Sequence, residues 1–132
     1  MSRHAKLEQL NPLVSAVVNA LSEKKGEEIR LLDVRDLVGY ADLLVIVGGQ
    51  STTQVQALVG AVEKAVQGRW RPTYVNRSPD NSWWILDFVD VVVHVFLQDV
   101  RLQYGLESLW GDAPEGWESV GLKPLKPSGG NG

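Results

Sequence analysis

The sequence predicts an α/β domain in which a mixed β-sheet packs with helices. Segments with helical periodicity alternate with short apolar runs typical of strands, in the order helix, strand, strand, helix, strand, strand, strand, helix. Two apolar runs, residues 43–47 and 91–97, have the composition of strands that helices cover on both faces. A strand–helix–strand unit around residues 43–75 permits a parallel crossover, whereas a later hairpin pairs antiparallel, so the sheet should be mixed.

The first elements are expected to be a helix and two strands. Residues 11–25 carry apolar side chains at helical spacing, with Asn11 as the expected N-cap and Pro12 at the first helical position. The strands are expected at residues 29–35 and 43–49, which are apolar stretches short enough for a strand.

The next helix has the most regular pattern in the chain. Its apolar stripe consists of Val55, Leu58, Val59, Val62 and Val66. Ser51 or Thr52 is expected to cap its N-terminus, and Gly68 is expected to end it. Residues 70–75 then predict a strand, and Pro72 favours a position at the edge of the sheet because proline cannot donate a ladder hydrogen bond.

The stretch WWILDFVDVVVHVFLQD is too long for one average strand and predicts a hairpin. Its two strands are expected at residues 83–87 and 91–97. A two-residue loop would place Asp87 opposite Asp90 and Trp83 opposite His94. Because Phe and Val disfavour the positive φ of such a turn, a wider loop is the alternative.

The last part of the chain predicts one short helix and a tail. Residues 99–111 fit a helix with Asp99 near its N-terminus, where a carboxylate is favourable. Residues 114–132 are rich in Pro, Gly and Ser and predict a flexible tail. We therefore expect one domain, residues 1–113, because a chain of this length can bury a core without disulfides.

The composition excludes several classes of function. The formal net charge is −3 and no run of Lys or Arg is dense enough to suggest binding to a DNA or RNA backbone, so a direct or sequence-specific reader of nucleic acid is disfavoured. The chain has no cysteine, so disulfides and thiolate chemistry are excluded. No signal peptide or long apolar span is visible, which predicts a protein of the cytoplasm without membrane contact.

The turn Gly48–Ser51 is a candidate phosphate site because it lies between a strand and the N-terminus of a helix. It lacks the lysine of a P-loop and the spacing of a dinucleotide-binding motif. A strand-to-helix turn with a Ser or Thr cap is therefore favoured over a nucleotide site.

The chemical candidates near the hairpin are carboxylates and one histidine. Asp42, Asp87 and Asp90 could hold Mg²⁺, but an offset of three residues places Asp87 and Asp90 on opposite faces of a straight strand. His94 has no evident partner for general base catalysis or metal binding. We therefore predict no catalytic residue, no metal and no cofactor.

The tryptophans point to recognition instead. Trp83 and Trp84 are adjacent, so on a strand one faces each side of the sheet. An exposed Trp is enriched in interface hot spots, while burial of both under helices is the alternative. Tyr104 and Trp110 raise the same question.

Two blocks of the sequence resemble a known family. They read W.ILDF.DVVVHVF, followed by R..Y.LE.LWGDA, and the upstream stretch LLDVRDL..YAD.LVIVGG.S..QV.A fits in the same order. Together they resemble the ribosomal silencing factor family, also called Iojap-like, over residues 13–113. The resemblance implies an α/β fold similar to nucleotidyltransferases without their catalytic carboxylates.

The resemblance also implies a function. Members of the family bind the large ribosomal subunit through its ribosomal protein number fourteen and block joining of the small subunit, which represses translation, and they are often homodimers. The implied partner-binding residues of this chain are Trp83, Asp87, Asp90, His94, Tyr104 and Trp110. Acidic and aromatic side chains suit a partner rich in Arg and Lys.

This chain departs from the family pattern at three places. Val89 stands where a Gly is usual, Thr53 where an Arg is usual, and Asn76-Arg77 where a Glu-Gly pair is common. Two other functions remain as alternatives, namely a nucleotidyltransferase-like enzyme that binds a nucleotide at Gly48–Ser51 and an assembly chaperone of the large subunit.

Overall fold

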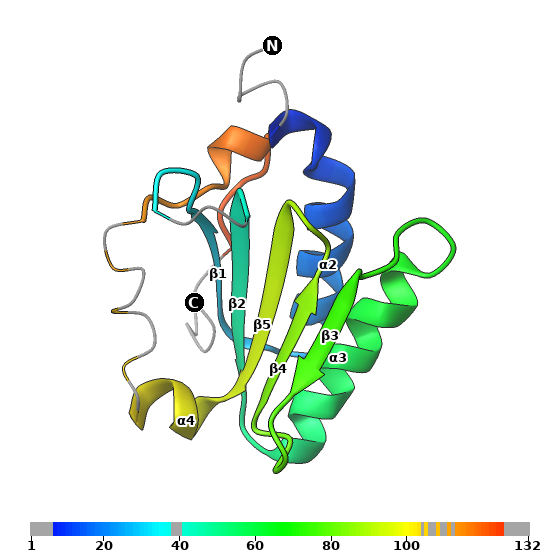
Figure 1. Cartoon of the computed structure of the whole chain (residues 1–132), viewed down its shortest axis with the longest axis vertical. Coiled ribbons are helices and arrows are strands. Elements are labelled where there is room, and N and C mark those ends of the chain that lie inside the picture. Colours follow the sequence, from blue (N-terminus) through cyan, green and yellow to red (C-terminus); the bar gives the residue numbers. More distant parts are fainter. Residues whose placement is uncertain are drawn as a thin grey trace.

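The computed structural model describes residues 7–37, 41–103, 105, 108, 111 and 113–125. Its elements are α2 (Asn11–Glu23), β1 (Glu27–Asp33), β2 (Leu43–Gly49), α3 (Thr52–Val66), β3 (Tyr74–Arg77), β4 (Trp83–Asp87), β5 (Val91–Leu97), α4 (Gln98–Gln103) and the 3-10 helix η2 (Glu118–Val120). Figure 1 shows them as one sheet with α2 and α3 on the same face.

The five strands form a mixed sheet in the order β1-β2-β5-β4-β3. β2 pairs parallel with β5, and the other three pairs are antiparallel. The predicted α/β class and mixed sheet are confirmed. β3 is an edge strand, as the proline before it indicates.

The two long helices begin differently. Ser51 caps α3, and its side chain accepts a hydrogen bond from the Gln54 amide, as predicted. α2 is preceded by Leu10, which offers no side-chain cap, so the prediction of Asn11 as N-cap is wrong. Asn11 instead lies inside the helix and donates its side-chain amide to the carbonyl of Val120. Its polar group therefore serves a contact between distant parts of the chain.

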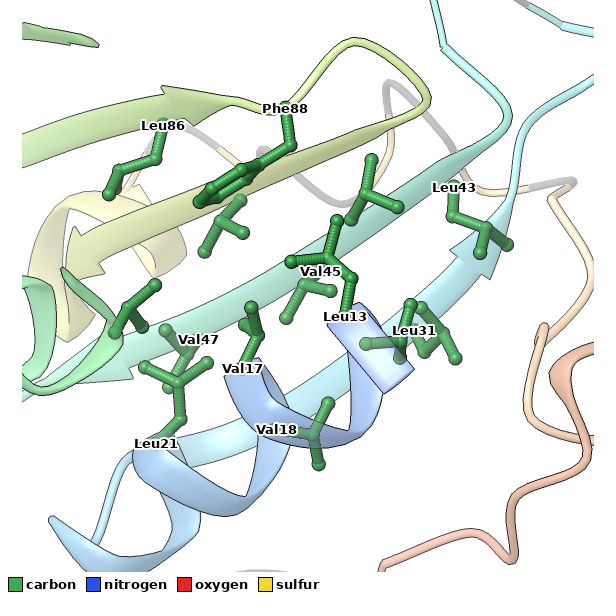
Figure 2. Packing of buried hydrophobic residues seen from close by; sticks show 14 of the residues in the cluster. Leu13, Val17, Val18, Leu21, Leu31, Leu43, Val45, Val47, Leu86 and Phe88 are labelled. Carbon is green, nitrogen blue, oxygen red and sulfur yellow. The ribbon is translucent and has the colours of Figure 1, made fainter. Parts of the chain in front are cut away.

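The face of the sheet under α2 and α3 carries the larger core cluster. Figure 2 shows Leu13, Val17 and Leu21 of α2 directed at the sheet, where Val45 and Val47 meet them. All five are at most 5% exposed. Alternate residues of each strand face this side, as the pleat of a strand requires.

The opposite face carries a second, smaller cluster. Its buried members are Leu32, Val34, Ala41, Leu44, Ile46, Val92, Phe96 and Ala113. The sequence predicted helices on both faces, but among the described residues the only helical contribution to this cluster is Val100 of α4, a helix of six residues. The apolar composition of β2 and β5 therefore reflects burial under short segments on this side.

The hairpin β4–β5 forms as predicted, but its register differs by two residues. Trp83 lies opposite Phe96, Ile85 opposite His94 and Asp87 opposite Val92. The expected pairing with a two-residue loop is therefore wrong, and three residues, 88–90, connect the strands. The shift by an even number keeps every side chain on its predicted face, because the side-chain period of a strand is two.

The segment after α4 differs from the predicted tail. The Pro114 carbonyl accepts a hydrogen bond from the Asp33 amide, and the Gly116 amide donates to Leu31. Trp117 and Val120 are 4% and 1% exposed within the helix-side core. The packed part of the chain thus extends beyond the expected boundary at residue 113, because two large apolar side chains follow the prolines and glycines that suggested a tail.

Candidate functional site

Three rings from the two strands of the hairpin form a cluster on the second face of the sheet. The Trp83 indole Nε1–H donates a hydrogen bond to His94 Nδ1 at 3.2 Å. The ring centroids of Trp83 and Phe96 are 4.9 Å apart, and those of His94 and Phe96 are 5.7 Å apart and nearly parallel. His94 is 6% exposed, while Trp83 is half-buried. Trp83 therefore presents part of its ring to solvent, with its one polar group already satisfied inside the protein.

His94 is a neutral imidazole in this arrangement. An indole N–H can only donate, so His94 Nδ1 must offer its lone pair and the ring proton lies on Nε2. Burial lowers the pKa of His94 from its ordinary value of 6.5 to about 4. The residue is thus a fixed acceptor that orients Trp83, and its Nδ1 lone pair is not available as a general base.

The carboxylates of the candidate site lie at the other end of the hairpin. Asp87 Oδ1 accepts a hydrogen bond from the Val89 amide at 2.7 Å, and Val89 has a φ of 76°. The Asp90 carbonyl accepts from the amides of Asp42 and Leu43, which ties the turn to the start of β2. Both aspartates thus help to hold the loop between the strands.

The predicted site residues therefore fall into two groups. Trp83 and His94 are in contact, whereas Asp87 is four residues from Trp83 along β4, or about 13 Å at the rise of a strand. Asp87 therefore does not lie beside Trp83, and the candidate site is a strip along β4 that runs from Trp83 to Asp87. The predicted residues Tyr104 and Trp110 lie outside the described residues.

A serine-rich turn beside Trp83 was not among the predicted site residues. Ser78 Oγ and Ser82 Oγ both donate to the Asp80 carboxylate, at 2.8 and 2.7 Å. The pKa of Asp80 is lowered by these hydrogen bonds, and the one from Ser82 has the larger effect. The spacing of Ser, Asp and Ser at alternate positions in SPDNS is the sequence signal for this closed turn.

Two hollows meet at this turn and share Trp83 as a wall. One, of about 340 Å³, is lined by Asn76, Arg77, Ser78, Pro79, Trp83 and Ile85. The other, of about 620 Å³, is lined by Ser78, Pro79, Asp80, Ser82, Trp83, Val100 and Gln103. An indole between two depressions offers a partner an apolar anchor with room on either side.

At the alternative nucleotide site Gly48–Ser51, the glycines lie close to side chains of the protein itself. A Cβ placed on Gly48 would lie 1.8 Å from the side-chain oxygen of Gln98, and one on Gly49 would lie 3.0 Å from Val55. The Gln50 amide donates to the Gln54 side chain, and Ser51 caps α3. These glycines serve close packing and the turn is a helix cap, as the favoured interpretation predicted.

Metal-binding clusters and membrane-spanning helices are both absent from the described part of the chain. Within it, no group of three or more His, Asp or Glu residues could hold a metal ion. No helix in these ranges is long and apolar enough to cross a membrane.

Comparisons with known proteins cover nearly the whole chain. The family model described as "Ribosomal silencing factor during starvation" matches residues 7–129. A ribosomal silencing factor of Halalkalibacterium halodurans is 39% identical over 103 residues, 77% of this chain and 88% of that protein. The chloroplastic protein Iojap of Zea mays is 35% identical over 98 residues, 74% of this chain and 43% of that protein. A crystal structure of a Chromobacterium violaceum protein has a TM-score of 0.70 at 28% identity, covering 89% of this chain and 93% of its own.

Proposed function

This chain belongs to the ribosomal silencing factor family, and we propose that it binds the large ribosomal subunit in the cytoplasm through the strip along β4. The observation that carries the proposal is the geometry of Trp83. Its Nε1–H already donates to His94, so a partner that covers the exposed part of the ring leaves no indole N–H without a hydrogen bond. Such a preoriented indole loses little conformational freedom on binding, which favours affinity.

Charge supports a basic partner for the same strip. Asp87 is half-buried on β4, and Asp90 follows it in the turn. Carboxylates at one end of an apolar strip complement a protein surface rich in Arg and Lys and fix its orientation. Ribosomal protein number fourteen, the partner that the resemblance implies, is our proposed target.

The proposed mechanism is steric occlusion and needs no reaction at the site. The bound protein would occupy space that the small subunit requires, so translation falls in proportion to the large subunits that are covered. His94 supports this role by holding Trp83, without a chemical step of its own. The homodimer that the resemblance implies is a separate prediction, which sedimentation equilibrium of the isolated protein would test.

Sedimentation with purified subunits tests the proposal. The protein should migrate with free large subunits but not with small subunits, and saturating protein should lower the yield of joined ribosomes when small subunits are added. Purified ribosomal protein number fourteen should compete for the protein. Binding to large subunits without any effect on joining would contradict occlusion and favour the assembly role.

A further inference from the structure

A second feature lies at the free edge of the sheet. All four residues of β3 are exposed, and among the described strands β3 pairs only with β4. Three arginines, Arg69, Arg71 and Arg77, occur in or just before this strand, and all three are exposed. We call these three residues the arginine edge.

The other described arginines have structural roles. Arg35 pairs with Asp33 at 2.6 Å, and Arg30 lies 3.6 Å from Glu115. Arg101 is 1% exposed and donates to two backbone carbonyls of β1. By contrast, no residue of the arginine edge pairs with a carboxylate in the described ranges of the chain.

Two guanidinium groups of the arginine edge lie over indole rings. Arg69 lies 4.1 Å from the ring centroid of Trp70, and Arg77 lies 5.7 Å from that of Trp84. Both indoles pack against the helix-side core cluster. A guanidinium over an indole ring is held in place by a cation–π contact. Arg77 Nη1 also donates to Asn81 Oδ1 at 3.0 Å, and the remaining N–H groups of the exposed side chain can bind phosphate.

The nearby carboxylates Asp80 and Asp87 make hydrogen bonds within their own turns and form no ion pair with the arginine edge. Asp80 accepts hydrogen bonds from two serine hydroxyls, and Asp87 accepts one from the Val89 amide. Although the chain has a net charge of −3, this edge carries three exposed arginines that form no ion pair with a described residue. Electrostatic attraction at short range depends on such local charge more than on the net value.

We infer that the arginine edge contacts the phosphate backbone of RNA without reading its sequence. Arg71 and Arg77 are six residues apart, up to about 20 Å in extended chain, which suits a polymer more than a single anion. Tyr74 is 55% exposed between them and can stack on an unpaired base. Arginines that lie over indole rings, together with an exposed aromatic, favour nucleic acid over an acidic peptide. The choice of RNA over DNA rests on the proposed function, because a ribosomal subunit contains RNA; the choice of nucleic acid does not.

The arginine edge and the Trp83 strip can be occupied together. Trp83 and Trp84 are adjacent on β4, so their side chains lie on opposite faces of the sheet. Trp83 joins the second-face cluster, whereas Trp84, under Arg77, joins the helix-side cluster. Arg77 also lines a hollow beside Trp83, so a protein on one face and RNA along the edge would meet at Arg77 but otherwise use different side chains.

Fluorescence anisotropy with a labelled, mixed-sequence single-stranded RNA tests the inference on the full chain. The variant Arg69→Gln/Arg71→Gln/Arg77→Gln should bind at least about tenfold more weakly, and the slope of log affinity against log salt should fall by about 2 for three lost contacts. The control Lys24→Gln/Lys64→Gln/Lys123→Gln removes the same charge from exposed positions elsewhere. It should keep nearly all of the wild-type affinity.

The outcomes separate this inference from the proposed function. Equal loss in both triple variants, or no binding by the wild type, would overturn it. An acidic peptide that binds as tightly as RNA would assign the edge to a protein instead. Trp83→Ala should leave the RNA affinity unchanged, and if sedimentation with large subunits persists while RNA binding fails, only the RNA inference is lost.

Discussion

The two faces of the sheet come from the same strands yet differ in kind. On the helix side, Val45, Val47 and Leu86 meet α2 and α3 in an apolar core whose buried members are all at most 9% exposed. On the other side, the half-buried Trp83 joins His94 and Phe96, and two hollows open beside them. The strand pleat separates these roles residue by residue.

The difference between the faces separates residues that stabilise the fold from residues that are available for binding. The helix side excludes water over a large area, so its contribution is mainly hydrophobic burial. The other side buries a polar pair and leaves an aromatic ring accessible, which contributes less to folding and more to docking. Variants on the two faces should therefore separate unfolding from loss of binding.

The largest effect is expected from a cavity on the helix side. Leu58 of α3 is fully buried, so Leu58→Ala should lower the free energy of unfolding by about 3 kcal/mol. Ile85→Ala, a half-buried position on the other face, should cost about 1 kcal/mol. Urea unfolding followed by circular dichroism measures both. Equal losses would contradict the contrast between the faces.

The second effect concerns pH and His94. Because the pKa of His94 is about 4 in the folded chain and 6.5 ordinarily, the unfolded chain binds more protons between these values. The free energy of unfolding should therefore fall as pH decreases from about 6.5 to about 4, by about 3 kcal/mol from this residue. Urea unfolding at pH 7 and at pH 4.5 measures the change.

A matched variant isolates that contribution from the carboxylates. His94→Gln keeps a side-chain acceptor for Trp83 but removes the titrating group. Its stability should depend less on pH in the same window than that of the wild type. Identical pH dependence of the two proteins would show that His94 does not titrate in this range.

The smallest effect is expected at the hairpin turn. Val89 has a φ of 76°, a conformation that a β-branched residue adopts only with strain. Val89→Gly should raise the free energy of unfolding by about 1 kcal/mol, despite the greater freedom of glycine in the unfolded chain. Val75→Gly, in the extended strand β3, is the control and should lower it. Thermal or urea unfolding distinguishes the two signs.

Much of the fold could be predicted from local patterns. The stripe of α3, its Ser51 cap and the hairpin follow from periodicity and turn chemistry, which depend on neighbouring residues. The register of the hairpin could not be predicted. It depends on a three-residue loop in which Asp87 accepts a hydrogen bond from the Val89 amide and Val89 has a positive φ. The packing of Trp117 against the core is a long-range contact. It could not be predicted from the local content of Pro, Gly and Ser, which is typical of a flexible tail.

The candidate site was predictable only in part. The sequence pointed to Trp83 and His94, and the face they share follows from the period of two. The hydrogen bond that orients Trp83 depends on a diagonal contact between strands, which spacing alone does not reveal. The position of Arg77 over Trp84 likewise requires the pairing of β3 with β4.

The adjacent tryptophans provide the most direct test of the docking strip. Trp83→Ala and Trp84→Ala make the same substitution on opposite faces, and each should be compared with the wild type by sedimentation with purified large subunits. Circular dichroism and urea unfolding check that both variants fold. If either variant does not fold, Asn76→Lys, an exposed substitution beside Trp83, is a second probe of the same face. We predict that Trp83→Ala and Asn76→Lys lose binding while folded Trp84→Ala retains it. Full binding by a folded Trp83→Ala variant would contradict the proposal that this face docks on the ribosome.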